Sequence, residues 1–162
     1  MKTAAGSAAT VYGSSVSGTI DQSVRRTFRV KPSNETVALV VQKLLELKDA
    51  IEKHFGVALK ECEEPQFLRY EPGDYFVAHQ DGNTPMIRDD SLHRRVSAII
   101  FLSDPADYEG GKLLFHGRYP DAMQRLEVPA PRGSLVAFPP EQTHEVTPLT
   151  AGSRFTIATW YR

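Results

Sequence analysis

One segment of the chain has the hydrophobic repeat of an amphipathic helix. Between residues 37 and 55, apolar side chains recur every three or four residues, and polar side chains occupy the opposite side. Pro32-Ser33-Asn34 supplies residues that cap the start of a helix, and Gly56 suits its end. We expect one main helix near residues 34–55, with a buried stripe made of Val37, Val40, Val41, Leu44, Leu47, Ile51 and Phe55.

After Pro65 the pattern becomes that of short β-strands. Runs of β-type residues alternate with turns rich in glycine and proline. Short strands at regular spacing favour a sandwich or barrel over a parallel α/β sheet. Another alternation of apolar and charged residues lies within residues 19–30. The strands expected after Pro65 are residues 66–70, 74–79, 95–102, 112–116, 134–138 and 154–161.

These elements predict a single domain. No internal repeat or long linker divides the chain, so the expected fold class is α+β, mainly β, with one helix packed against a sandwich. The domain would comprise residues 19–162. Residues 1–18 are mostly small and polar. We expect them to form a flexible N-terminal segment, although a first strand also fits.

Composition narrows the possible functions. The 162 residues include 19 Lys and Arg against 20 Asp and Glu, a formal net charge of −1. A non-specific nucleic-acid binder normally has a basic excess, so no nucleic-acid partner is expected. No apolar run approaches the roughly 20 residues of a membrane span, so we expect a cytoplasmic protein without a membrane partner. The only cysteine, Cys62, receives no role, and any metal site has to be built from His and carboxylates.

Two short motifs suggest such a metal site. His79 and Asp81 lie two residues apart at the end of a predicted strand, so their side chains point to the same face. Alone, this motif also fits a histidine hydrogen-bonded to a loop aspartate. His144 lies 63 residues after Asp81, behind another predicted strand, and a sandwich can bring the two strand ends together. Two histidines and one carboxylate are the ligand set of non-haem Fe(II) oxygenases.

Arg154 adds a possible anion receptor. It follows His144 by ten residues and begins a strand on which Arg154, Thr156 and Trp160 share one face. An arginine at a strand end commonly extends to solvent. Beside an iron site, however, its guanidinium can bind a carboxylate through two parallel hydrogen bonds.

The arrangement resembles 2-oxoglutarate/Fe(II)-dependent dioxygenases, and its flanking sequence is similar to the prolyl 4-hydroxylase-like branch. The similar stretches are RYEPGDYFVAHQD at 69–81, EGGKLLF at 109–115, residues 133–138 before His144, and the closing TWYR. Together they extend over residues 66–162. The resemblance implies a double-stranded β-helix, or jelly roll, with supporting helices.

The resemblance also implies roles for individual residues. His79, Asp81 and His144 would bind Fe(II), and no catalytic residue beyond these ligands is expected. The distal carboxylate of 2-oxoglutarate would meet Arg154, with Thr156 or Tyr70 as hydroxyl partners. O₂ would be the second cosubstrate and ascorbate a possible reductant. Oxidative decarboxylation would yield succinate and CO₂ and leave one oxygen atom in a C–H bond of the substrate.

The substrate is expected to be a prolyl residue in a protein or peptide. The same chemistry on a free amino acid or secondary metabolite is one alternative, and a non-catalytic jelly-roll module that senses or binds is another. Arg94, Arg95 and Trp160 are candidate substrate contacts, and residues 82–94 are long and polar enough for a gating loop. One departure concerns Phe101, which has no hydroxyl where a tyrosine of hypoxia-type prolyl hydroxylases helps to hold the distal carboxylate.

Overall fold

Helix α1 (Asn34–Phe55) forms where the hydrophobic repeat predicts it. In the computed structural model, which describes residues 6–8, 24–82, 89–118 and 120–162, the Ser33 hydroxyl accepts a hydrogen bond from the amide of Thr36. Gly56 ends the helix with a left-handed φ of 65°. The buried stripe is narrower than expected. Leu44 and Ile51 are buried, whereas Leu47 is 43% exposed, because the helix meets the sheet along one side of the stripe only.

The strands after Pro65 lie close to their predicted positions, and several shorter ones were not predicted. The long ones are β4 (Gln66–Tyr70), β5 (Tyr75–His79), β6 (Val96–Phe101), β8 (Leu113–His116), β10 (Leu135–Phe138) and β13 (Arg154–Tyr161). The short ones are β1 (Gly6–Ala8), β2 (Arg25–Arg26), β3 (Phe28–Val30), β7 (Tyr108–Gly110), β9 (Arg125–Glu127), β11 (His144–Val146) and β12 (Leu149–Gly152). Two 3₁₀ turns, η1 (Asp90–His93) and η2 (Pro105–Asp107), complete the elements.

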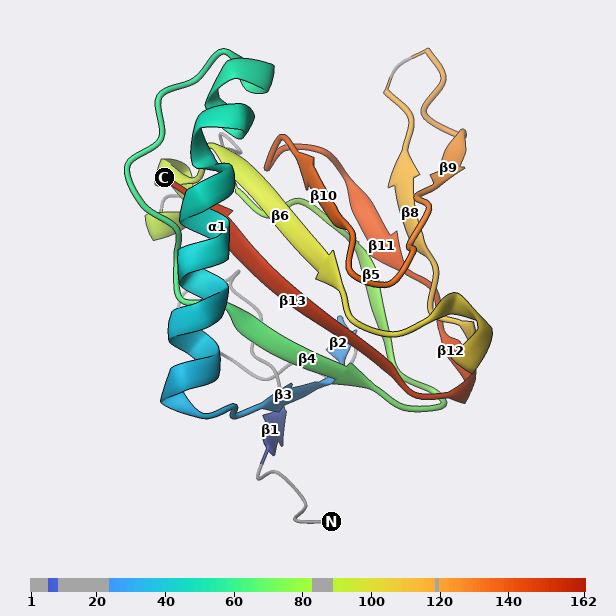
Figure 1. Cartoon of the computed structure of the whole chain (residues 1–162). Helices are drawn as coiled ribbons and strands as arrows, with labels where there is room; N and C mark the ends of the chain where they lie inside the picture. Colours follow the sequence, from blue (N-terminus) through green and yellow to red (C-terminus); the bar gives the residue numbers. More distant parts are fainter. Residues whose placement is uncertain (1–5, 9–23, 83–88, 119) are drawn as a thin grey trace.

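The strands form two facing antiparallel sheets. The larger sheet has the order β1-β3-β4-β13-β6-β10 and the smaller one β2-β5-β11-β8-β9, while β7 and β12 form a separate pair. From β4 to β13 the main strands alternate between the two sheets, which is the winding of a jelly roll (Figure 1). The expected double-stranded β-helix with one main supporting helix is therefore confirmed.

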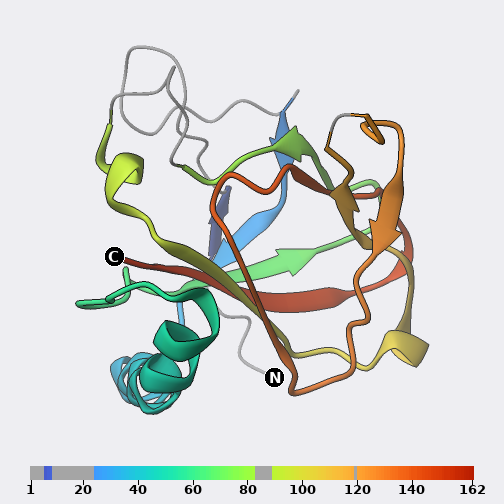
Figure 2. The same ribbon diagram turned by 90° about the horizontal axis from the view of Figure 1, so that it is seen from above.

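The larger sheet is packed on both of its faces. Between the two sheets lies one apolar cluster, which includes Leu68, Phe101 and Val146. On the outer face, α1 covers part of the sheet through a second cluster, which includes Leu44 and Tyr161. Figure 2 shows the helix on the side of the larger sheet that faces away from the smaller one. Alternate residues of β13 thus pack into two different apolar clusters, one on each face of the larger sheet.

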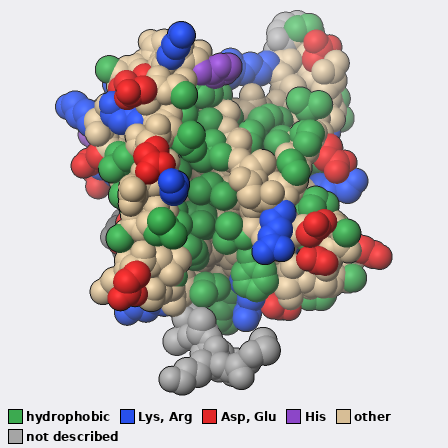
Figure 3. All heavy atoms as spheres, in the orientation of Figure 1, with side chains coloured by type: hydrophobic (Ala, Val, Ile, Leu, Met, Phe, Trp, Pro, Cys, Tyr) green, Lys and Arg blue, Asp and Glu red, His purple; other side chains and the backbone are tan. Residues whose placement is uncertain are grey.

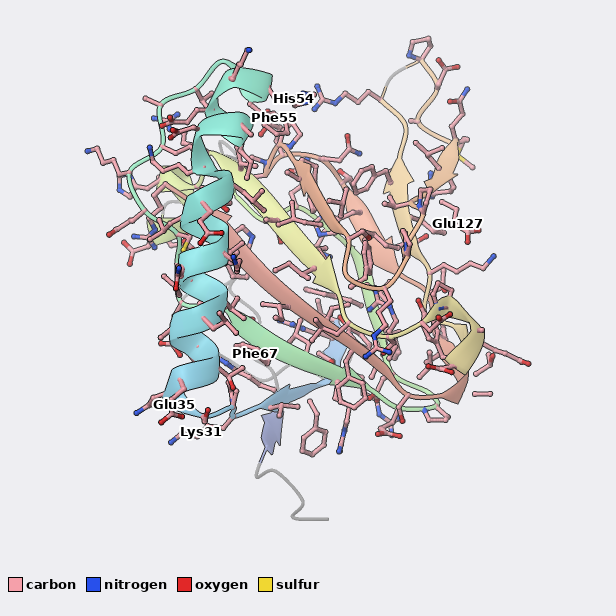
Figure 4. The ribbon with its side chains drawn as sticks, viewed as in Figure 1. Lys31, Glu35, His54, Phe55, Phe67 and Glu127 are labelled. Carbon is pink, nitrogen blue, oxygen red and sulfur yellow. The ribbon has the colours of Figure 1, made fainter. Side chains whose placement is uncertain are left out.

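The outer face of the larger sheet is only partly covered by α1. Phe67 of β4 is 9% exposed and lies beside the helix (Figure 4). Farther along the sheet, Leu102 and Phe155 are each 38% exposed. Figure 3 shows apolar side chains gathered in the hollow alongside the helix.

Two predicted segments lie wholly or partly outside the described residues. Of residues 1–18, only Gly6–Ala8 are described, and they form β1 against β3. Six of the thirteen residues of the proposed gating loop, 83–88, are not described. Within the described part of the chain, no helix is long and apolar enough to cross a membrane.

Candidate active site

Strand pairing brings His79, Asp81 and His144 to one end of the smaller sheet. β5 ends at His79 and β11 begins at His144, and the two histidines face each other in antiparallel register. The amide of Asp81 donates a hydrogen bond to the carbonyl of Pro140, 2.8 Å away in the turn before β11. The structure therefore brings together all three residues that the sequence suggests as metal ligands.

The three side chains form a compact set of donor atoms. One nitrogen of each imidazole and a carboxylate oxygen of Asp81 lie within 4.8 Å of one another. Nε2 of His79 is 3.5 Å from Oδ1 of Asp81, and Nε2 of His144 is 3.7 Å from Oδ2. Nδ1 of His79 donates to the carbonyl of Val77 at 2.8 Å. Nδ1 of His144 donates to the carbonyl of Gln142, also at 2.8 Å. Because each Nδ1 carries a proton, each Nε2 offers its lone pair to the common centre.

The protonation states suit metal binding. Burial alone raises the pKa of the Asp81 carboxyl, but hydrogen bonding with His79 and the charges that His144 and His79 carry when protonated outweigh it and hold that pKa far below its usual range. The Trp160 indole N–H also favours the carboxylate, although it falls short of a regular hydrogen bond. Burial lowers the pKa of His144, more than the Asp81 charge raises it. An ionised carboxylate beside neutral imidazole is the donor chemistry that Fe(II) needs.

Arg154 lies on the first position of β13 and is 2% exposed. It pairs with Tyr70 across the strands, and its Cζ lies 5.1 Å from the centre of the Tyr70 ring and 5.7 Å from that of Phe101. Its Nε has no hydrogen-bond partner, and no carboxylate of the described residues forms an ion pair with it. A buried cation without a carboxylate is costly unless a ligand supplies one, so Arg154 fits an anion receptor.

Two glycines make room for Arg154. Gly110 and Gly111 join β7 to β8 with φ values of 73° and 57°. A Cβ on Gly111 would lie 3.1 Å from Cδ of Arg154 and 2.8 Å from Cδ1 of Leu149. The Gly-Gly pair in the EGGKLLF stretch therefore leaves space for the stem of the arginine.

A single cavity of about 490 Å³, including its open mouth, connects these groups. The cavity is lined by the three candidate ligands and by Arg154. Tyr70 and Thr156, which are 2% and 3% exposed, also line it. The remaining wall is mostly apolar and includes Leu68, Phe76, Ala98, Ile99, Val146, Ala158 and Trp160.

Sequence reasoning did not identify Arg25, a second arginine of the cavity wall. Arg25 is 7% exposed, and its guanidinium lies 4.7 Å from the centre of the Phe76 ring, which is stacked on His79. Burial lowers the pKa of Arg25, and nearby Tyr70 and Asp81 partly offset this effect. The doublet Arg25-Arg26 carries no signal that tells which arginine faces inward. The register in which β2 pairs with β5 determines that Arg25 does.

The candidate substrate residues occupy three different environments. Trp160 is 8% exposed and lines the cavity. Arg95 is exposed, and its amide donates to the carbonyl of Tyr161. Arg94, in contrast, is buried in a bidentate ion pair with Glu63. Glu63 already neutralises the charge of Arg94, and contact of Arg94 with a substrate stays a prediction.

Comparison with known proteins identifies the family. The model of the 2OG-Fe(II) oxygenase superfamily matches residues 65–162. The chain belongs to the 2OG-Fe(II) oxygenase superfamily. This name implies Fe(II), 2-oxoglutarate and O₂ as metal and cosubstrates, in agreement with the His-Asp-His donor set.

Relatives of this oxygenase include PKHD-type hydroxylases. One from Paraburkholderia phytofirmans is 38% identical over 97 residues, which cover 59% of this chain and 41% of that protein. One from Burkholderia cenocepacia is 33% identical over 156 residues, or 93% of this chain and 66% of that protein. The chain thus spans between two fifths and two thirds of the length of these relatives.

A solved structure shows the same fold. A prolyl-4-hydroxylase from Pseudomonas putida superposes with a TM-score of 0.67 and 27% sequence identity, over 86% of this chain and 73% of that one. The covered share of this chain is larger than the matched family region, residues 65–162.

Proposed function

We propose that this oxygenase is an Fe(II)/2-oxoglutarate-dependent hydroxylase that inserts one oxygen atom into a C–H bond of a prolyl residue in a protein or peptide. One observation carries the proposal: a His-Asp-His donor set and a buried arginine without a carboxylate partner line the same cavity. The names of the relatives, PKHD-type hydroxylases and a prolyl-4-hydroxylase, support the reaction type and the substrate class.

His79, Asp81 and His144 would hold the iron. The two Nδ1–H bonds to backbone carbonyls fix the ring orientations, and the ionised Asp81 supplies the negative charge. When bound, iron together with 2-oxoglutarate and O₂ supplies the oxidant that converts C–H to C–OH, with succinate and CO₂ as coproducts. Ascorbate as a reductant of the iron is part of the proposal, and its effect on the total number of turnovers tests it.

Arg154 would bind the distal carboxylate of 2-oxoglutarate. The fork of the guanidinium suits bidentate contact with a carboxylate, and the Thr156 hydroxyl lies in the same cavity wall. Tyr70 would be a second hydroxyl partner, since its ring centre lies 5.1 Å from Cζ of Arg154. Phe101 contributes packing and no hydroxyl at this end, so Arg154 with Thr156 or Tyr70 would recognise the carboxylate.

The apolar wall would exclude water and receive the ring of a prolyl residue. Trp160 and Phe76 belong to this wall, and the Phe76 ring is stacked on that of His79. Residues 19–162 would form the catalytic unit. A cytoplasmic location stays a prediction.

Two measurements test the proposal together. Purified protein is supplied with Fe(II), 2-oxoglutarate and O₂, and succinate is quantified with and without proline-rich peptides or free amino acids. Mass spectrometry then searches for products that are heavier by one oxygen atom. We expect Fe(II)-dependent succinate formation that peptide stimulates, together with a hydroxylated prolyl residue.

The control is Asp81→Ala, which removes the carboxylate and should abolish succinate formation. Hydroxylation of free amino acids instead of peptides would overturn the substrate class but not the reaction. If the wild-type protein binds Fe(II) yet forms no succinate under any of these conditions, the enzymatic proposal is wrong.

A further inference from the structure

Arg94 lies at the centre of a buried network beside the candidate metal site. Its side chain is 9% exposed and follows η1 directly. Nε and Nη2 donate to the two carboxylate oxygens of Glu63, each at 2.8 Å, and Nη1 donates to the backbone carbonyl of Asp81 at 2.7 Å. Its Cζ also lies 3.8 Å from the centre of the Trp160 ring. One guanidinium thus connects a carboxylate, a backbone carbonyl and an aromatic face.

Glu63 is a rigid anchor for this arginine. Its amide donates to the carbonyl of Trp160 at 2.8 Å, and its own carbonyl accepts from the Thr159 hydroxyl at 2.7 Å. Arg162 contacts the same carboxylate through Nε at 3.0 Å. The position of Arg94 is therefore set by the end of β13, which belongs to the larger sheet.

The backbone of Asp81 is held from both sides. Its amide donates to the carbonyl of Pro140, in the turn that leads to His144, and its carbonyl accepts from Arg94. Gly82, the next residue, lies so close to Ser91 of η1 that a Cβ would collide with the Ser91 carbonyl. The two ends of the segment between Asp81 and Arg94 are therefore locked together.

We propose that Arg94 is a positioning residue, which holds the backbone of Asp81 and the ring of Trp160 in the arrangement that binds the metal. The inference rests on the proposed function, since it concerns the Fe(II) site. Arg94 does not touch the ligand atoms; it acts through the Asp81 carbonyl. Partners of this outer kind typically change metal affinity about 10- to 100-fold when they are removed.

The test measures metal affinity without any substrate. Metal-free protein is titrated with Mn(II), which does not oxidise as Fe(II) does, and bound metal is quantified by equilibrium dialysis. The fluorescence of Trp160, the only tryptophan of the chain, reports the same event from within the network. We expect Arg94→Ala to weaken Mn(II) binding about 10- to 100-fold and to move the metal-dependent change in Trp160 emission to Mn(II) concentrations higher by the same factor.

Glu63→Gln gives a second, milder variant. It keeps the shape of the side chain and removes the charge that anchors Arg94, so Mn(II) binding should weaken by a smaller factor. The double variant should bind Mn(II) as weakly as Arg94→Ala alone, because both substitutions remove the same contact between Arg94 and Glu63.

A neighbouring ion pair provides matched controls. Arg29 and Glu64 form an exposed pair 3.7 Å apart, with side chains 39% and 77% exposed. Arg29→Ala and Glu64→Gln therefore repeat the same chemical changes, the latter one residue away from Glu63. Both variants should bind Mn(II) as the wild type does.

The possible contrary results distinguish an error in the role of Arg94 from an error in the proposed function. Wild-type Mn(II) affinity in a folded Arg94→Ala variant would overturn the inference, and so would a change confined to the KM of a peptide substrate, which would make Arg94 a substrate contact. If Arg94→Ala does not fold, wild-type affinity in Glu63→Gln would overturn it. A wild-type protein that binds no metal and forms no succinate would instead overturn the proposed function.

Discussion

Replacing Arg154 by methionine should separate recognition of 2-oxoglutarate from stability of the fold. Arg154→Met keeps an unbranched apolar stem against Tyr70 and Phe101 and removes a buried charge without a carboxylate partner. The unliganded variant should therefore be about as stable as the wild type, because no ion pair is broken.

The effect on binding follows from the lost hydrogen bonds. A bidentate contact between guanidinium and carboxylate contains two charge-assisted bonds, each worth about 1.5 kcal/mol at the lower end of the usual range. Their sum of about 3 kcal/mol corresponds to a Kd for 2-oxoglutarate that is about 150-fold weaker.

Thermal unfolding in the presence of Mn(II) measures this difference. At a 2-oxoglutarate concentration of about 100 times the wild-type Kd, the ligand stabilises the wild type by about 2.7 kcal/mol. For a domain of this size the gain corresponds to a rise in Tm of about 5–11 °C. The same concentration should stabilise Arg154→Met by only about 0.3 kcal/mol, or about 1 °C.

A second ligand supplies the control. 2-Oxobutyrate has the same 2-oxo acid group and lacks the distal carboxylate, so it should bind the wild type weakly and Arg154→Met equally weakly. The reasoning is refuted if the variant still prefers 2-oxoglutarate to 2-oxobutyrate by the wild-type factor.

Three further predictions concern other parts of the molecule. Burial lowers the pKa of His144 below its ordinary 6.5, so below that pH the unfolded state binds more protons than the folded state, and the metal-free protein should lose stability as the pH falls through about 6.5. His144→Gln should flatten a plot of Tm against pH. An equally steep plot for this variant would contradict the lowered pKa of His144. Tyr161→Phe removes the 2.7 Å hydrogen bond from the Tyr161 hydroxyl to the Leu44 carbonyl, in the interface where burial raises the pKa of Tyr161 to about 12. In urea unfolding, the free energy of unfolding should fall by about 1–2 kcal/mol. An unchanged unfolding midpoint would mean that this hydrogen bond contributes nothing to stability. Gly111→Ala places a Cβ against the stem of Arg154 at a residue with a left-handed φ. The KM for 2-oxoglutarate should rise, and the free energy of unfolding should fall by about 1–3 kcal/mol. Wild-type kinetics would show that the Arg154 side chain can move aside without loss of 2-oxoglutarate binding.

The sequence was most informative where one periodicity or one motif determined the structure. The apolar repeat together with the capping residues at both ends predicted α1 and its bounds, and alternation along residues 154–161 predicted that Arg154, Thr156 and Trp160 share one face of β13, which lines the cavity. The His-x-Asp spacing placed two candidate ligands on one face because they are local. His144 could be added because a sandwich joins strand ends that lie far apart in sequence.

Long-range pairing determined what the sequence did not reveal. Arg25 reaches the cavity only because β2 pairs with β5, and two residues are too few to show an alternation. Arg94 looked like a free cation at the end of a polar loop, since nothing in the chain shows that Glu63, 31 residues earlier, lies within 2.8 Å of it. Ion pairs between distant segments are a property of the fold and have no local pattern.

The two-sided packing of β13 has a consequence for how this protein tolerates substitutions. Thr156, Ala158 and Trp160 face the cavity, whereas Thr159 and Tyr161 point toward the helix or the segment that follows it. A systematic scan of this strand, scored separately for protein abundance and for succinate formation, should therefore show a period of two. Substitutions at positions facing the helix would deplete the protein itself, and those facing the cavity would leave an abundant but inactive one. Selection for a new substrate would thus find its usable variation on every second residue of β13.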